Sequence, residues 1–228
     1  KNGEHTLNYA PEIDFTEATS KLKVVVSDGR EGKEAIGYVK AYVNMDVATL
    51  NVGSQPLANN AHVKYPDAFG MVSLNDLKTY SVDYAIANEV NAKNVDFKFY
   101  CFGASGSPRL YSMDNTGKDG EFSGSTGKLS AIKVKNLTRF AILSNFDYEN
   151  ATVASISSEI LSSSIAQSLL DPIAVGNVIA FRTGGSSAAG GGRIGVMKVI
   201  NITEPKELVS NNATARVMTV EIKFPKKK

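Results

Sequence analysis

Residues 95–101 read Val95-Asp96-Phe97-Lys98-Phe99-Tyr100-Cys101, and their strict alternation decides how the first half of the chain folds. Side chains of a β-strand point alternately to its two faces, so this pattern predicts a half-buried strand. The apolar face carries Val95, Phe97, Phe99 and Cys101, and the opposite face carries Asp96, Lys98 and Tyr100. Cys101 is therefore expected to be an inert, buried thiol.

Other stretches repeat this strand signal along the chain. Period-2 patterns or β-branched apolar runs predict further strands at 22–26, 35–43, 47–52, 131–135, 139–143, 178–183, 193–202 and 218–224. The last three are expected to form a meander. Residues 53–66 and 103–127 are rich in loop-forming residues, and the second of these is predicted to be a soft boundary or a long connection.

Two regions have helical patterns. Apolar residues at 3/4 spacing predict an amphipathic helix over 80–91, with Thr79 or Ser81 as its N-cap. A second helical region lies between 148 and 170, and its clearest stripe is Leu161, Ile165 and Leu169. The sequence Asp171-Pro172 should end it, because a residue before proline is disfavoured in the α conformation.

The predicted elements define an α+β fold of mainly antiparallel sheets with a few short amphipathic helices. We divide the chain into an extended lead-in at 1–18, an N-terminal α+β half at 19–125 and a C-terminal α+β half at 126–228. The two halves are of similar size.

Composition argues against several classes of protein. The 25 basic and 23 acidic residues leave a net charge of +2, so we expect no nucleic-acid partner. One cysteine cannot form an internal disulfide, and two histidines cannot build the common Cys/His zinc cages, so no metal or cofactor is expected. No stretch approaches the roughly 20 apolar residues of a membrane-spanning helix.

Residues 190–195, Gly-Gly-Gly-Arg-Ile-Gly, match the letters of the dinucleotide-binding motif G-x-G-x-x-G. That motif works where a strand and a glycine turn lead into a helix whose N-terminus faces the pyrophosphate. The residues that follow here are strand-like, so we interpret 184–192 as a flexible hairpin loop.

Candidate catalytic residues do not form a convincing group. His5 lies in the lead-in and His62 in a loop, so neither is positioned by the pattern to activate a nucleophile. The loop carboxylates Asp114, Asp119 and Glu121 lack regular calcium-ligand spacing and are interpreted as a solvated turn. We identify no catalytic, cofactor-binding, metal or binding residue. The hypothesis that the protein is an enzyme is therefore not the favoured one.

Three further sequence features concern the surface. The sequons at Asn136, Asn150, Asn201 and Asn212 are attributed to a composition rich in Asn, Ser and Thr. The aromatic residues Tyr80, Tyr84, Tyr100, Phe102 and Tyr111 could form a ledge for a sugar or peptide, against the alternative of ordinary packing. The lysines at 226–228 are interpreted as a solvated terminus.

Three stretches carry a resemblance to a known group. Residues 94–103 with 110–112, residues 136–140, and the hairpin 176–183 with 195–199 resemble segments of uncharacterised secreted lipoproteins of Bacteroidetes. The similarity spans about 71–202. It departs from the group's pattern at Asn177, in the ending of 109–112 and in the long loop 184–192.

The resemblance implies an exported protein at the cell envelope or outer surface, held by a lipidated cysteine upstream of Lys1. A first residue other than methionine fits the expectation that a leader has been removed. The resemblance implies no activity and no site residues.

These observations favour a non-enzymatic envelope or surface protein with a binding or scaffold role. The alternative is a glycan-binding or glycan-processing surface protein, and a third option is a structural partner in a surface assembly through edge-strand pairing. Its partners would be an unknown surface protein or glycan, with membrane contact only through the lipid anchor.

Overall fold

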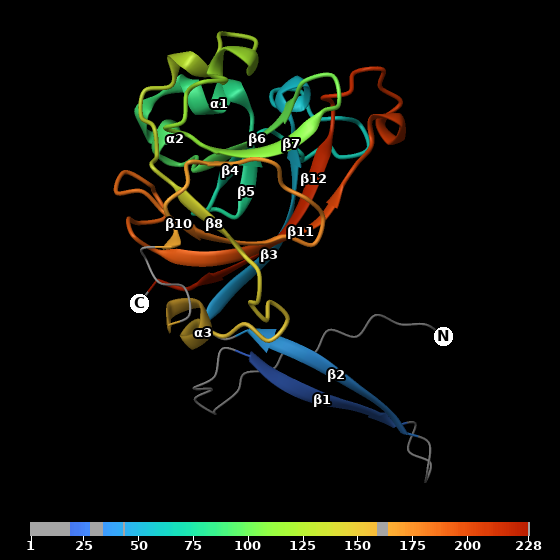
Figure 1. Ribbon diagram of the computed structural model, residues 1–228. Helices are drawn as coiled ribbons and strands as arrows, with labels where there is room; N and C mark the ends of the chain where they lie inside the picture. The colour runs from blue at the N-terminus through green and yellow to red at the C-terminus, as the bar shows by residue number, and fades with distance from the viewer. Residues whose placement is uncertain (1–18, 28–33, 43, 159–163, 228) are drawn as a thin grey trace.

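Two five-stranded antiparallel sheets stack on one another in the computed structural model (Figure 1), which describes residues 19–27, 34–42, 44–158 and 164–227. We name each sheet after one of its inner strands. The β12 sheet has the order β3-β12-β11-β10-β8 and consists of β3 (Met45–Gly53), β8 (Arg139–Leu143), β10 (Val178–Arg182), β11 (Ile194–Ile202) and β12 (Val217–Pro225).

The β6 sheet has the order β5-β4-β6-β7-β9 and consists of β4 (Met71–Ser73), β5 (Lys78–Tyr80), β6 (Phe97–Phe102), β7 (Ser107–Ser112) and β9 (Leu169–Leu170). With its short helices, the structure is an α+β fold, as predicted. The predicted meander is also confirmed, because β10, β11 and β12 are consecutive neighbours. Each sheet contains one strand from the other predicted half: β3 in the β12 sheet comes before residue 125, and β9 in the β6 sheet comes after it. The division into two halves stays a prediction.

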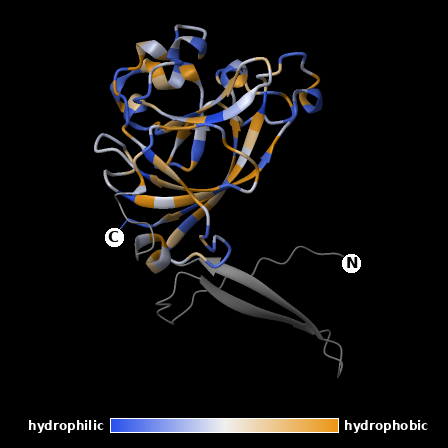
Figure 2. Cartoon of the chain, in the orientation of Figure 1, coloured by the Kyte–Doolittle hydropathy of each residue, from blue (hydrophilic) through white to orange (hydrophobic). Residues whose placement is uncertain are grey.

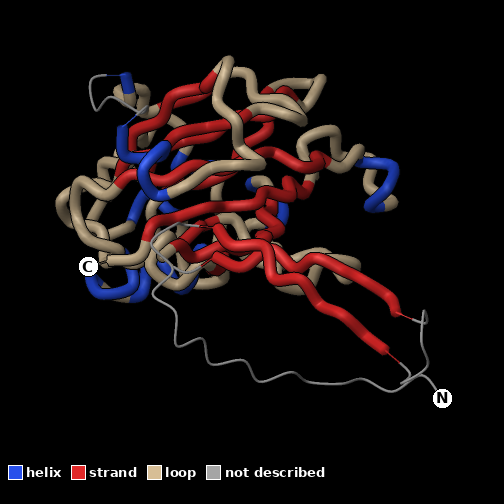
Figure 3. The backbone as a smooth tube through the Cα atoms, turned by 90° about the horizontal axis from the view of Figure 1, so that it is seen from below, coloured by secondary structure: helices blue, strands red, loops and turns tan. Residues whose placement is uncertain are grey.

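A separate antiparallel hairpin precedes the sheets. Strand β1 (Thr19–Ser27) pairs with β2 (Glu34–Tyr42) from Thr19 opposite Tyr42 to Ser27 opposite Glu34. In Figures 1 and 3 this hairpin extends away from the stacked sheets. Both strands were predicted, whereas the predicted lead-in 1–18 and residues 28–33 lie outside the described residues.

The main hydrophobic core lies between the two sheets, and hydrophobic residues recur along the strands of both (Figure 2). Phe97, Phe99 and Cys101 of β6 enter this core, as the alternation predicted. Val95 was predicted on the same face, but it precedes β6 and packs with Tyr100 on the other side of the sheet. They meet Phe140 of β8 and Phe181 of β10, and the rings of Phe97 and Phe140 pack edge to face at 5.8 Å between centroids.

A second core covers the outer face of the β6 sheet. It forms under α1 (Val82–Ala87), α2 (Glu89–Lys93), η2 (Asp119–Glu121) and η3 (Leu129–Ala131). Val82 and Ala85 of α1 and Tyr100 of β6 are buried in it. The other face of β6 is therefore covered by protein and does not face solvent.

On the opposite side of the molecule, α3 (Val153–Ser158) covers the outer face of the β12 sheet, where Ile156 packs with Ala180 and Val196. The short turns η1 (Gln55–Leu57) and η5 (Pro205–Leu208) lie in connections. Among the described helices, none is long and apolar enough to cross a membrane.

The predicted helix 80–91 is wrong in its extent. Tyr80 belongs to β5, and the helix is divided into α1 and α2 at Asn88, whose backbone is extended. The Asn88 side chain accepts the N–H of Asn91 and so begins a new helix. Ser81 is the N-cap of α1, as predicted, because its hydroxyl accepts the N–H of Tyr84.

Two other predictions from the middle of the chain are corrected. Residues 103–127 are not a structureless connection, because Gly103 and Gly106 adopt positive φ and turn the chain back into β7, which pairs with β6. Residues 131–135 do not form a strand. Ile132 is buried in the core beneath α1, so its apolar period reflects that contact and not a β-ladder.

The second helical region is shorter than predicted. The described part of the helix is α3, Leu169 lies in β9, and Leu161 falls outside the described residues. Ile165 is buried against Ile156 of the same region, so the apolar stripe marks the core without continuing the helix. The peptide bond between Asp171 and Pro172 is cis.

Candidate functional site

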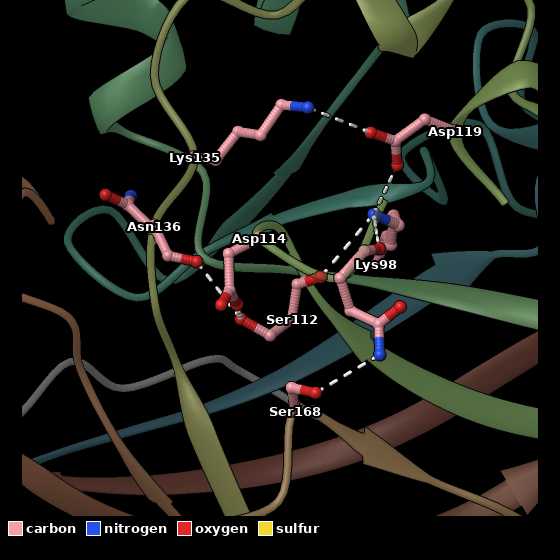
Figure 4. Close-up of polar contacts among 8 residues, drawn as sticks. Lys98, Ser112, Asp114, Asp119, Lys135, Asn136 and Ser168 are labelled. Atoms are coloured by element: carbon pink, nitrogen blue, oxygen red, sulfur yellow. Dashed lines mark hydrogen bonds and ion pairs between the residues drawn. The ribbon is translucent and has the colours of Figure 1, made fainter. Parts of the chain in front are cut away.

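A group of buried and half-buried polar side chains lies on the outer face of the β6 sheet, and Figure 4 shows its members except Arg139. We call this group the Lys98 cluster. It comprises Lys98, Ser112, Asp114, Asn115, Asp119, Lys135, Asn136, Arg139 and Ser168. Strands β6, β7 and β8 and the segment that includes η2 contribute its members.

Lys98 lies at the centre of the cluster, and its side chain is 0% exposed. Its Nζ donates to Asp119 Oδ1 at 2.6 Å, to the Asn115 carbonyl at 3.0 Å and to the Ser112 carbonyl at 3.4 Å. An ammonium group has three N–H donors, so each of them meets an acceptor. Burial holds the pKa of Lys98 below its ordinary value, although the Asp119 carboxylate opposes that shift.

Asp119 corrects the interpretation of the loop carboxylates as a solvated turn. Its side chain is 3% exposed, because the turn η2 directs it onto the sheet, and its second oxygen lies 3.8 Å from Nζ of Lys135. Glu121 is closer to the prediction and lies at the surface, where it accepts from Lys118 and from the hydroxyl of Tyr100.

Asp114 forms a two-point ion pair with Arg139 at the edge of the cluster, at 2.8 and 2.7 Å. Burial alone would raise the pKa of Asp114, but hydrogen bonds from Arg139 and Ser112 hold it below its usual range. The same pairing raises the pKa of Arg139. The two groups are therefore charged partners at any physiological pH.

Asn136 joins three parts of the fold from a fully buried position. Its Nδ2 donates to the carbonyls of Lys93 and Val95, each at 2.8 Å, and its Oδ1 accepts from the Ser186 hydroxyl at 2.7 Å. An amide used in this way cannot carry a glycan in the folded protein. The other sequon residues, Asn150, Asn201 and Asn212, are exposed.

The contacts of the Lys98 cluster serve to hold the fold together. Lys98, Asp119 and Asn136 direct their hydrogen bonds to other protein groups, and all three are buried. Removing such polar groups from water is tolerated only when they find protein partners. The cluster fixes segment 112–139 and helix α2 onto the β6 sheet.

Cys101 is buried and unpaired with another cysteine, as predicted. Burial raises the pKa of its thiol to about 12, so the thiolate needed for nucleophilic chemistry is scarce at neutral pH.

The five aromatic residues proposed for a ledge do not share one exposed face. Tyr100 and Tyr111 are buried and pack edge to face at 5.6 Å, whereas Tyr80 and Tyr84 stack with each other at 4.0 Å. Phe102 is 40% exposed. Its ring is covered by the guanidinium of Arg109 at 4.1 Å and by the ammonium of Lys118 at 5.0 Å.

The glycine-rich loop 184–192 joins β10 to β11, and no helix follows it, as the failure of the motif's context predicted. The interpretation as a flexible loop is corrected for its first part. Ser187 and Ala189 are buried, and the Ala188 N–H donates to the Lys93 carbonyl at 2.8 Å. A Cβ on Gly184 would lie 2.5 Å from the Leu137 nitrogen, so close packing explains that glycine.

Two hollows are among those that open on the surface of the described residues. The larger, of about 510 Å³, is bordered by 190–194, Ser157 and the chain end at 225–227. Its Arg193 is already engaged, because it donates to the Ala189 carbonyl and stacks on Phe224 at 3.9 Å.

The smaller hollow, of about 320 Å³, lies where the edge strands β3 and β5 of the two sheets approach each other. We call it the seam hollow, and it is lined by Thr49, Leu50, Asn51, Asp67, Phe69, Leu77, Lys78 and Thr79. Among the described residues, no three His, Cys, Asp or Glu side chains gather in a way that could hold a metal ion.

The sequence pattern missed the Lys98 cluster because it interpreted the second face of residues 95–101 as solvent-facing. One signal pointed the other way. The apolar stripe of 82–90 needs a surface to pack on, and Tyr100 offers apolar area on that second face.

The fold defines the class of this protein as an α+β protein built on two stacked antiparallel sheets. No family model matches the chain, and no curated protein matches it. Among solved structures it is similar to a DUF4466 family protein from Parabacteroides merdae ATCC 43184, with a TM-score of 0.51 and 13% sequence identity. The alignment covers 85% of this chain and 59% of that chain, so the chain spans less than two thirds of its neighbour. At this identity the likeness concerns the fold.

Proposed function

We propose that this chain is a non-enzymatic binding or scaffold module of the cell envelope, exposed outside the inner membrane. The observation that carries the proposal is the Lys98 cluster, whose charged side chains Lys98 and Asp119 are buried inside the described fold. Its buried members bind one another and the backbone, so their charges serve stability.

The sequence resemblance to secreted lipoproteins of Bacteroidetes supports an envelope location. The fold neighbour from Parabacteroides merdae supports the fold and not the location. A lipidated cysteine upstream of Lys1 would hold the module at the membrane surface. A rigid double-sheet body would then present its loops and edges to a surface protein or glycan.

Localisation can be tested with the full-length gene product in its native host. We expect the protein in the membrane fraction, labelled by palmitate and cleaved by protease added to intact cells. Recovery of an unlabelled protein from the cytosol would overturn the envelope assignment. Turnover of any polysaccharide in a broad substrate panel, lost on substitution of a single carboxylate, would overturn the non-enzymatic assignment.

The second candidate function is glycan binding, and the seam hollow is the observation that favours it. Its polar groups Asn51, Asp67 and Lys78 stand beside the apolar side chains of Leu50 and Leu77. Pockets of roughly 300 Å³ or more that mix a few polar groups with apolar surface are typical of small-ligand sites. The hollow is of a size for one or two sugar rings.

A glycan array tests this candidate. We expect wild type to retain a defined set of glycans, and Asn51→Ala or Lys78→Ala to weaken retention by about tenfold, the effect of about 1.4 kcal/mol. Lys93→Ala, at a lysine of α2 that is paired with Glu89 and does not line the hollow, is the matched control and should bind as wild type does. Retention that none of these variants alters would place the glycan elsewhere and remove the seam hollow as its site.

A further inference from the structure

The pair formed by Lys98 and Asp119 is close and enclosed. Lys98 Nζ lies 2.6 Å from Asp119 Oδ1, and the two side chains are 0% and 3% exposed. The rings of Tyr111 and Phe122 flank Nζ at 6.0 Å from each centroid. An amine and a carboxyl group thus share an interior site bounded by aromatic carbon.

The two residues are held from different elements. Lys98 is fixed by β6 in the middle of its sheet, and Asp119 begins η2, 21 positions later in the chain. The Asn115 carbonyl at 3.0 Å further restrains Nζ. Such restraint raises the effective concentration of one group at the other far above any value reached in solution.

We propose that Lys98 and Asp119 join spontaneously, after folding, in an amide bond between Nζ and Cγ. A proton first passes from the ammonium to the carboxylate, which gives a neutral amine and a neutral acid. The amine lone pair attacks Cγ, the N–C bond forms, one C–O bond breaks, and that oxygen leaves as water with two protons. The balance is one ammonium and one carboxylate in, one amide and one water out, with no oxidant or cofactor.

Several features of the site favour this reaction. Burial disfavours the charged pair relative to the neutral pair, and it lowers the pKa of Lys98, which increases the fraction of nucleophilic amine. Lys135, 3.8 Å from the second oxygen of Asp119, stabilises negative charge that develops on this oxygen during attack. The product keeps one N–H, and the Asn115 carbonyl is placed to accept it.

The inference does not rest on the proposed function, and its test is separate. The intact, denatured protein should weigh less than its sequence by one water molecule, and digestion should release a branched peptide that contains both Lys98 and Asp119. Asp119→Ala and Lys98→Arg should each have the full sequence mass. Lys223→Arg, at a second buried lysine whose Nζ donates to the Tyr148 carbonyl at 2.6 Å, should keep the loss of water.

One side reaction has the same mass change and must be separated. Asp119 precedes Gly120, and an Asp-Gly sequence can lose water to a cyclic imide without any lysine. Loss of water that persists in Lys98→Arg, or a dehydrated wild type without the branched peptide, would overturn the proposal. Wild type at its full mass would also overturn it, and none of these readings requires the variants to fold well.

Discussion

The two faces of β6 differ in what buries them. Phe97, Phe99 and Cys101 enter an apolar core between two sheets, whereas Lys98 and Tyr100 enter a layer closed by α1, α2 and η2. One face is stabilised by apolar packing, and the other combines packing with the buried Lys98–Asp119 pair. A polar residue in a strand can therefore lie on a buried face, provided that another segment of the chain supplies its partner.

The largest expected effect comes from breaking the polar face. Asp119→Ala leaves the charge of Lys98 buried without its carboxylate, and we expect a loss of about 4 kcal/mol in unfolding free energy. Urea denaturation measures this loss. The double variant Lys98→Met with Asp119→Leu removes both charges and should recover the part of the loss that comes from the unpaired buried ammonium, but not the part that comes from a lost Lys98–Asp119 amide cross-link. A loss below about 1 kcal/mol in the single variant would show that the pair does not secure this face.

The apolar face should respond almost as strongly. Leu110 of β7 lies opposite Phe99 and is fully buried in the core between the sheets. Leu110→Ala should cost about 3 kcal/mol through lost burial and the cavity that remains. Thermal and urea unfolding measure it, with the exposed Leu137→Ala as a control that changes stability little. Equal effects of the two substitutions would contradict the assigned core.

The pH dependence of stability should reflect the buried carboxyl group of Asp96, next to the start of β6. Burial raises the pKa of Asp96 to about 6 from an ordinary 3.8, although the Leu74 N–H bonded to its carboxylate opposes the shift. The folded form therefore keeps a proton that the unfolded form has lost. The resulting stability is complete below pH 4 and is lost as the pH rises to 6, by about 2 to 3 kcal/mol.

Asp96→Asn cannot ionise and keeps an oxygen for the Leu74 N–H. We expect this variant to match wild type near pH 4 and to exceed its stability above pH 6. Urea midpoints at a series of pH values measure the difference. A constant difference between variant and wild type over this interval would refute the assignment.

The smallest effect is expected at the junction of the two layers. Asn136→Ala leaves the carbonyls of Lys93 and Val95 without their side-chain donors, and we expect a loss of about 2 kcal/mol. Hydrogen exchange should also increase in α2, which these bonds hold to the sheet. Asn150→Ala, at an exposed sequon, is the control and should leave both quantities unchanged.

Local sequence patterns were enough to predict the α+β class, most of the strands and the burial of Cys101. These features depend on local periodicity, and periodicity is written into neighbouring residues such as Phe97, Phe99 and Cys101. The cap at Ser81 was predictable for the same reason, because its partner is only three residues away. The end of α1 at Asn88 and the short strand β4 have weaker local signals and were not predicted.

Which polar residues are buried depends on contacts between segments that are distant in the sequence. Lys98 and Asp119 are 21 positions apart, and Asn136 meets Ser186 across 50 positions, so no local pattern relates them. A charged residue in a strand is compatible with solvent or with a buried partner, and the free energy of burial depends on whether that partner is present. Folding of the segments that cover the β6 sheet places this partner beside the charged residue. For that reason the Lys98 cluster could be recognised in the fold but not in the sequence pattern.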